Sequence, residues 1–253
     1  MKIIASDFDG TFTYGGVDEE RRQAVRDWRE AGNQFGIVSG RGASFLTETF
    51  PRYQVPYDFF VGHNGALVAD AQGKILWEKT CPAWVIGPLL DFLAEHDCPE
   101  CYVHSCAVIM PGYEPRRTPA ITKEEAIQKG DFLQLSPYLR SREEAAALTE
   151  EIREKFGQWV NPLQNGGIID IVASGVDKAS GIRKMLELMG GREEDVIAVG
   201  DNINDRAMIE AFRSCAVENA VEEIKELADF VMPNVTDLIR KELEPIWCRR
   251  NLP

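Results

Sequence analysis

Acidic residues follow two apolar runs of this sequence. Asp7-Phe8-Asp9-Gly10-Thr11 lies at the end of a predicted strand over Ile3 to Phe8, and Gly200-Asp201-Asn202-Ile203-Asn204-Asp205 directly follows Val196 to Val199. Two carboxylates one residue apart at a strand end can both reach the crevice beyond a sheet, where one attacks and one moves a proton. Oxygen ligands at the second strand end suit Mg²⁺. Each segment alone could be a solvated loop or a helix cap, but two in one chain favour a site.

Two further segments could bind a phosphate group. Val38-Ser39-Gly40-Arg41 ends a predicted strand over residues 35–38, and a hydroxyl with backbone N–H groups at a helix start is a natural phosphate donor. Lys178 follows Gly175-Val176-Asp177 at the start of a predicted helix. A Ser cap and a surface Lys are the ordinary interpretations of such residues in isolation. Beside the acidic cluster, where we expect it, Lys178 would offset negative charge.

The composition restricts the class of partner. The chain has 253 residues, a formal charge of −13 and a pI near 4.8. A negative field of this size disfavours nucleic acid and anionic membranes, and a phosphate site would need a metal, a Lys or backbone N–H groups. No stretch approaches the roughly 20 apolar residues of a membrane span, and the N-terminal apolar run is too short for a signal peptide. We therefore expect a cytoplasmic protein whose six cysteines are free thiols.

The order of the predicted elements indicates an α/β fold. Apolar runs alternate with helical periodicity, which predicts a Rossmann-like, doubly wound parallel-sheet core. The rhythm changes near Cys81-Pro82 and resumes at Asp177. We expect a discontinuous core over residues 1–80 and 175–253, with an inserted α/β cap domain over residues 81–174. Within the insertion the sequence predicts helices from residue 83, Thr122 and Ser141, an extended segment over 101–110, and paired strands over 158–164 and 167–173.

A cluster of possible metal ligands lies in the insertion, namely His96, Cys98, Cys101, His104 and Cys106. A C-x-x-C pair with nearby His could bind zinc or act as a dithiol. Along a single strand, however, alternate residues face opposite ways, so Cys101 would face away from His104 and Cys106. This arrangement favours cysteines buried as small apolar side chains, with zinc binding as the alternative.

The four motifs in this order resemble the haloacid dehalogenase superfamily of phosphatases. The insertion between Ser39-Gly40-Arg41 and Lys178, together with His63-Asn64-Gly65-Ala66 and Gly175 to Gly181, is similar to the Cof-like subfamily. Ala216-Val217-Glu218-Asn219-Ala220 also resembles that subfamily, although Glu218 stands where a small residue is more usual. No catalytic position departs from the pattern.

The resemblance implies a role for each site residue. Asp7 would attack phosphorus and form an aspartyl-phosphate, and Asp9 would be the general acid and then the general base. Mg²⁺ would be held by Asp7, the Asp9 backbone carbonyl and Asp201, with Asp205 just behind. The residues implied in binding phosphate or substrate, or in orienting the loops that do so, are Thr11, Ser39, Gly40, Arg41, Asn64, Lys178 and Asn204. In the insertion, Asp170 is a candidate substrate contact.

The function implied is hydrolysis of a small phosphorylated metabolite such as a sugar phosphate. The same core could instead pass the phosphoryl group to a sugar, as a phosphotransferase or phosphomutase. A non-catalytic regulator that binds a metabolite is a third possibility, which the presence of both Asp7 and Asp9 disfavours. The sequence does not indicate which substrate is bound or what the oligomeric state is.

Overall fold

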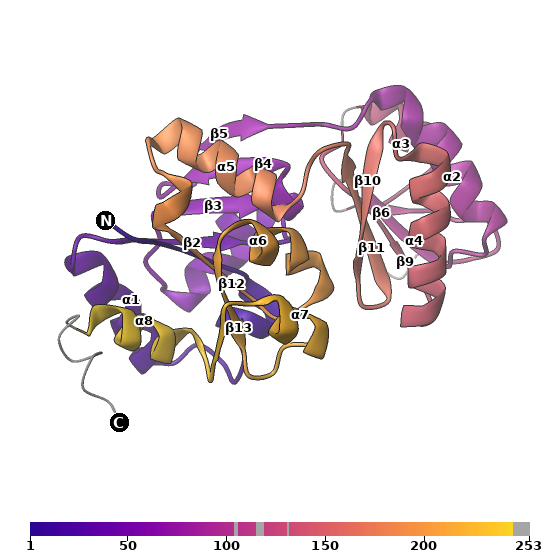
Figure 1. The fold of residues 1–253 in the computed structure, drawn as a ribbon. Coiled ribbons are helices and arrows are strands. Elements are labelled where there is room, and N and C mark those ends of the chain that lie inside the picture. The colour runs from indigo at the N-terminus through magenta and orange to yellow at the C-terminus, as the bar shows by residue number, and fades with distance from the viewer. Residues whose placement is uncertain (104–105, 115–118, 131, 245–253) are drawn as a thin grey trace.

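The computed structural model describes residues 1–103, 106–114, 119–130 and 132–244, and these form two sheets with flanking helices (Figure 1). The core sheet has eight strands in the order β14-β13-β12-β1-β2-β3-β4-β5. Its strands are β1 (Ile3–Ser6), β2 (Gln34–Val38), β3 (Phe59–Gly62), β4 (Leu67–Asp70), β5 (Ile75–Glu78), β12 (Val196–Gly200), β13 (Arg213–Val217) and β14 (Phe230–Met232). All neighbours pair in parallel except at the β3-β4-β5 edge, where pairing is antiparallel.

Helices cover both faces of the core sheet, as the alternation of β1 requires. On one face Ile4 belongs to an apolar cluster with Trp28 and Leu238. On the other face Ile3 belongs to a cluster with Ile182. The helices of this part are α1 (Glu19–Glu30), α5 (Lys178–Met189), α6 (Arg206–Ala211), α7 (Glu222–Leu227) and α8 (Val235–Leu243). The predicted doubly wound α/β core is confirmed.

A second, six-stranded sheet, which we call the cap sheet, has the order β10-β11-β9-β6-β7-β8. Its strands are β6 (Glu100–Val103), β7 (Cys106–Val108), β8 (Ala120–Ile121), β9 (Leu135–Tyr138), β10 (Val160–Asn165) and β11 (Ile168–Ala173). The helices of this part are α2 (Ile86–Glu95), α3 (Lys123–Lys129) and α4 (Arg142–Phe156). The core strand that precedes the cap sheet in the sequence, β5, ends at Glu78, and the last strand of the cap sheet, β11, ends at Ala173. The predicted boundaries at 81 and 174 fall in these connections and remain predictions.

Two strand predictions differ from the structure. The first strand ends at Ser6 rather than Phe8, because the carbonyls of Asp7 and Phe8 accept from the N–H groups of Phe12 and Thr13 in the turn that follows. The segment over 101–110 is not one extended strand, because β6 and β7 pair antiparallel with Val103 opposite Cys106. Side chains directly opposite each other share a face of a sheet, so the prediction that Cys101 and Cys106 face opposite ways is wrong.

The cysteines of the insertion are buried in its apolar cluster. Cys98, Cys101 and Cys106 are 1%, 0% and 8% exposed. Burial raises the pKa of the Cys98 thiol to about 11 and that of Cys101 well above its ordinary value. Within the described ranges, the groups of three or more possible metal ligands include none of these thiols. His104 lies outside the described residues.

The two ends of the described chain are joined by a buried carboxylate. Glu242 of α8 accepts from Lys2 at 2.6 Å and from Arg213 at 2.7 Å, and its side chain is fully buried. Burial alone would raise the pKa of Glu242, but the hydrogen bonds from Arg213 and Lys2 outweigh it and lower the pKa to about 2.

Among the described helices, none is both long and apolar enough to cross a membrane.

The Glu242 ion pairs predict a pH-dependent loss of stability in Glu242→Gln. At neutral pH the variant should lose about 1–2 kcal/mol of unfolding free energy, because two charge-assisted bonds are weakened. The folded-state pKa lies below the unfolded value of about 4.3, so this contribution is present above that pH and is lost as pH falls toward the folded pKa. Urea unfolding at about pH 7 and pH 3.5 would test this. An equal deficit at both pH values would contradict it.

Candidate active site

Four neighbouring parallel strands deliver the predicted site residues to one edge of the core sheet. Asp201, Asp7 and Ser39 directly follow β12, β1 and β2, and Asn64 follows β3 by one residue. The backbone N–H of Asp7 donates to Val199 O at 2.8 Å, which ties the start of this loop to β12. The carboxyl ends of parallel strands are where open α/β sheets bind ligands. The structure therefore brings together residues that lie far apart in the sequence.

Lys178 is the cation at the centre of the acidic cluster. It is the first residue of α5, whose N-cap Asp177 accepts from the Ser180 backbone N–H. Its ammonium is fully buried, lies 2.6 Å from Asp7 Oδ1, and also forms an ion pair with Asp205. Burial works to lower the pKa of Lys178, but the carboxylates of Asp205 and Asp7 outweigh it and raise the pKa. The lysine therefore stays charged inside the protein.

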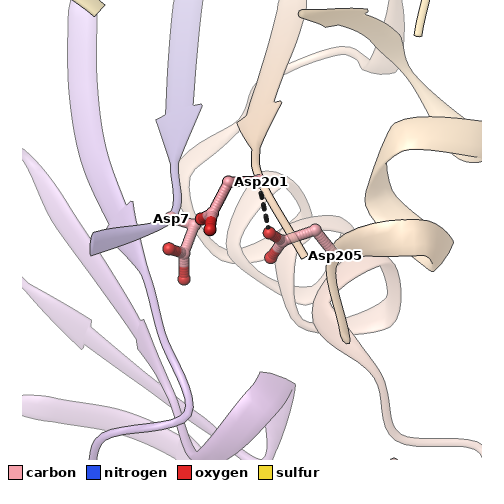
Figure 2. A group of neighbouring side chains, drawn as sticks. All are labelled: Asp7, Asp201 and Asp205. Carbon is pink, nitrogen blue, oxygen red and sulfur yellow. Dashed lines mark hydrogen bonds between the residues drawn. The ribbon is translucent and has the colours of Figure 1, made fainter. Parts of the chain in front are cut away.

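Three carboxylates form a group that could hold a divalent cation (Figure 2). Each of Asp7, Asp201 and Asp205 offers an oxygen, and these oxygens lie within 4.8 Å of one another. The oxygens of Asp205 are already used, because Oδ1 binds Lys178 and Oδ2 accepts from the backbone N–H groups of Asp201 and Asn202 at 2.8 and 3.0 Å. Asp7 and Asp201 are thus the carboxylates best placed to hold Mg²⁺, and Asp205 positions the Asp201 loop and the lysine.

The protonation of the two remaining carboxylates also indicates a cation site. Burial raises the pKa of Asp7 well above its ordinary value despite the opposing charge of Lys178, and Asp205 and Asp201 raise it further. Burial and the charge of Asp205 raise the pKa of Asp201 to about 6. Carboxylates that repel one another in a buried site are stabilised by a shared cation, and hard oxygen ligands are those that Mg²⁺ prefers. The donor set therefore suits Mg²⁺.

The loop after β1 fixes Asp201 in place. The Thr11 hydroxyl donates to Asp201 Oδ1, and the amide of Asn219 donates to the backbone carbonyl of Gly10 at 2.8 Å. A Cβ added to Gly10 would lie 2.5 Å from Asp201 Oδ2, so this close approach requires glycine. Asn219 was not among the predicted site residues, although its segment carried part of the family resemblance.

Asp9 is paired with Arg41 rather than with the other carboxylates of the site. The two side chains form a bidentate ion pair with Nε–Oδ2 and Nη2–Oδ1 distances of 2.6 and 2.7 Å. The guanidinium also lies over the Phe45 ring, 4.6 Å from its centroid. Both side chains are about half exposed. Asp9 therefore reaches the site from the solvent side, with its carboxyl group held by Arg41.

A cavity of about 490 Å³ lies between the core sheet and the cap sheet. The predicted residues that line it are Asp7, Asp9, Ser39, Gly40, Arg41, Asp170, Asp201 and Asn204. Asn64 is fully buried, and its amide bonds to Asp170 and Gln134 instead of lining the cavity. The lining residues that the sequence did not predict are Gln134, Ser136, Tyr138, Asn165, Ile168 and Asn202. Most of these belong to the cap sheet, where no motif marks them.

Comparisons with known proteins agree with this geometry. The sequence model of the haloacid dehalogenase-like hydrolases matches residues 4–238. A phosphoglycolate phosphatase from Methanothermobacter thermautotrophicus is 30% identical over 91% of both chains. A 5-amino-6-(5-phospho-D-ribitylamino)uracil phosphatase from Bacillus subtilis is 26% identical over 96% of this chain and 94% of its own. The structure of a HAD/COF-like hydrolase from Plasmodium vivax superposes with a TM-score of 0.80 at 24% identity, covering 96% and 95% of the two chains.

The contact between Gly10 and Asp201 predicts different effects of two Gly→Ala changes. Gly10→Ala and Gly15→Ala both place a side chain at positive φ, which costs about 1–2 kcal/mol each, but only the Gly10 Cβ meets Asp201. Gly10→Ala should weaken Mg²⁺ binding by at least about tenfold, because it displaces a ligand. Gly15→Ala should bind as the wild type does. Calorimetric titration with Mg²⁺ checks both, and wild-type affinity in Gly10→Ala would show that this contact does not matter.

Proposed function

The chain belongs to the haloacid dehalogenase-like hydrolase family, and we propose that it is a Mg²⁺-dependent phosphatase acting on a small phosphorylated metabolite such as a sugar phosphate. The observation that carries the proposal is the position of Asp7. Its carboxylate lies at the end of β1, lines the cavity, and is flanked by Lys178 and Asp201. The curated relatives described above are phosphatases that act on different small phosphorylated molecules.

The first step is attack by Asp7. One carboxylate oxygen bonds to phosphorus while the bond from phosphorus to the leaving-group oxygen breaks, which gives an aspartyl-phosphate on Asp7. A phosphate dianion approaches a carboxylate only if positive charge offsets their repulsion. Lys178, 2.6 Å from Asp7, supplies part of this charge. Ser39 and the backbone N–H of Gly40, which line the same cavity, bind phosphate oxygens.

Asp9 moves the protons in both steps. It donates a proton to the departing oxygen, and it then takes a proton from the water that attacks phosphorus and releases Asp7 and inorganic phosphate. Both carboxylate oxygens of Asp9 are bound by Arg41 in the structure. We infer that the phosphate group of the substrate draws Arg41 away from Asp9 before the proton is donated.

A divalent cation would complete the site. Asp7 and Asp201 would hold it together with the backbone carbonyl of Asp9. When bound it neutralises charge on the phosphate and on the carboxylates. Asp205 would act indirectly, by holding Lys178 and the backbone N–H groups of the Asp201 loop. We place this reaction in the cytoplasm, with a small phosphorylated metabolite as the partner and neither nucleic acid nor membrane.

The proposal is tested by phosphate release from a panel of phosphorylated metabolites, with Mg²⁺ and after chelation. We expect release from one or a few members that is lost on chelation and restored by Mg²⁺. Transfer of phosphate to an added sugar, in place of release, would favour a phosphotransferase. A folded, Mg²⁺-loaded protein that releases no phosphate from any member would contradict hydrolysis.

Replacing Asp7 should abolish turnover while the fold persists. Asp7→Asn keeps the size of the side chain but removes the attacking carboxylate, so kcat should fall by at least about a thousandfold. Asp91→Asn, on the exposed surface of α2, is the matched control and should keep full activity. Circular dichroism verifies folding of both variants. Turnover close to wild type in Asp7→Asn would rule out this nucleophile.

A further inference from the structure

The cavity is poor in positive charge. The charged side chains that line it are the carboxylates of Asp7, Asp9, Asp170 and Asp201 and the guanidinium of Arg41. Arg41 is already bound by both oxygens of Asp9. Lys178 is fully buried behind the cavity between Asp7 and Asp205. A phosphate group with Mg²⁺ would be bound by the charged residues of the core-sheet side, such as Asp7, Asp201 and Lys178. The mechanism above assigns no role to Asp170.

Asp170 is a buried carboxylate held by uncharged donors. It is 5% exposed. Its Oδ1 accepts from Gln134 Nε2 at 2.9 Å and from the Ser136 hydroxyl at 2.8 Å, and its Oδ2 accepts from Asn64 Nδ2 at 2.9 Å. Burial raises the pKa of Asp170, and the hydrogen bonds from Ser136 and Asn64 and the charge of Lys178 act against that rise. When Asp170 is ionised, its neutral donors do not cancel its charge, so its field acts on whatever occupies the cavity.

The fold turns this carboxylate toward the reaction site. Its neighbours in β11, Ile169 and Ile171, pack in the apolar cluster of the cap sheet. Successive side chains of a strand point to opposite faces, so Asp170 faces the core sheet. A Cβ added to Gly40 would lie 3.1 Å from Asp170 Oδ2, which places that oxygen beside the loop expected to bind phosphate. The leaving group of a bound ester would therefore meet Asp170.

The wall around Asp170 consists of polar side chains that carry no positive charge. Gln134, Ser136 and Tyr138 line it from β9 and the residue before it, and Asn165 lines it from β10. Amide and hydroxyl groups of this kind pair well with the hydroxyl groups of a sugar or polyol. A carboxylate on the leaving group would instead be buried near Asp170 with no unpaired cation among the described lining residues, and an unpaired buried charge is strongly disfavoured.

We propose that Asp170 is a specificity-determining residue, which selects uncharged, hydroxylated leaving groups and excludes leaving groups that carry a carboxylate. The inference rests on the proposed function and narrows its substrate class. The expected substrate preference differs from that of the similar phosphoglycolate phosphatase, whose named substrate carries a carboxylate beside the phosphate ester. It is closer to the related B. subtilis phosphatase, whose named substrate has a ribityl chain.

Arg41 is the side chain that could instead bind a carboxylate on the leaving group. If a substrate carboxylate replaced Asp9 on the guanidinium, the site would prefer anionic leaving groups. The test therefore compares esters that differ only at that group. Glycerol 3-phosphate and 3-phosphoglycerate are one such pair, and erythritol 4-phosphate and 4-phosphoerythronate are a longer one. The quantity measured is the ratio of kcat/KM for the hydroxymethyl ester to that for the carboxylate ester, at saturating Mg²⁺.

In the wild type we expect this ratio to exceed about ten for at least one pair. Asp170→Asn removes the charge and keeps the shape, so the ratio should fall by about tenfold, mainly through faster turnover of the carboxylate ester. Glu124→Gln, an exposed neutralisation on α3, should leave the ratio unchanged. A wild-type preference for the carboxylate esters, or an Asp170→Asn variant that slows both esters equally, would overturn the proposal.

A second variant guards against misfolding. In Asp170→Asn the new amide can face the amide of Asn64, donor against donor. The double variant Asn64→Asp, Asp170→Asn exchanges the two side chains. The amide at position 170 can then donate to the carboxylate at position 64, and the negative charge lies one hydrogen bond away from its wild-type position. It should restore most of the selectivity, and a double variant that folds but stays unselective would contradict an electrostatic role. If the wild type released no phosphate from either pair or from the wider panel, the proposed function itself would have failed.

Discussion

The structure depends on one buried cation between two carboxylates. Lys178 has no exposed surface and is charged because Asp7 and Asp205 flank it. Asp205 still pairs with Lys178 when Asp7 alone is neutralised, but removing both carboxylates would leave an uncompensated buried charge, which typically costs about 3–5 kcal/mol. The constraint joins the end of β1, the start of α5 and the loop after β12. These three segments come from distant parts of the chain, and the lysine fixes their relative positions at the point where we propose that phosphate is bound.

The core and the cap sheet contribute different properties to the cavity. The core sheet brings rigid loops at strand ends, with glycine where backbone and carboxylate approach closely, as between Gly10 and Asp201. Preorganised charge of this kind is usually the largest contribution to catalysis. The cap sheet brings uncharged polar groups and one carboxylate, which face the phosphate loop across the cavity. Under this proposal the core sheet carries the reacting groups, and the cap sheet contributes to the choice of substrate.

The sequence predicted the core well because its signals are local. Asp7, Ser39, Lys178 and Asp201 each follow a strand or begin a helix, and parallel strands necessarily gather their ends. Other features are set by tertiary contacts. The pairing of Val103 with Cys106 reverses the chain inside what looked like one extended segment. Asn64, expected to contact substrate, donates its amide N–H to Asp170. Gln134 and Ser136 belong to no sequence motif, because they contact Asp170 only through their positions in and beside the cap sheet. The roles of all these residues in the reaction remain predictions.

The central claim is that Asp7 carries the phosphoryl group, and trapping the acyl phosphate tests it most directly. A substrate found by the phosphate-release panel would be mixed with enzyme for one turnover, quenched in acid and treated with borohydride, which reduces an aspartyl-phosphate to homoserine. Peptide mass mapping would then locate the change. We predict homoserine at position 7 in the wild type when substrate and Mg²⁺ are present, and unmodified Asp7 when either is omitted. Active enzyme in which Asp7 is never modified, or in which another carboxylate is modified instead, would contradict the account.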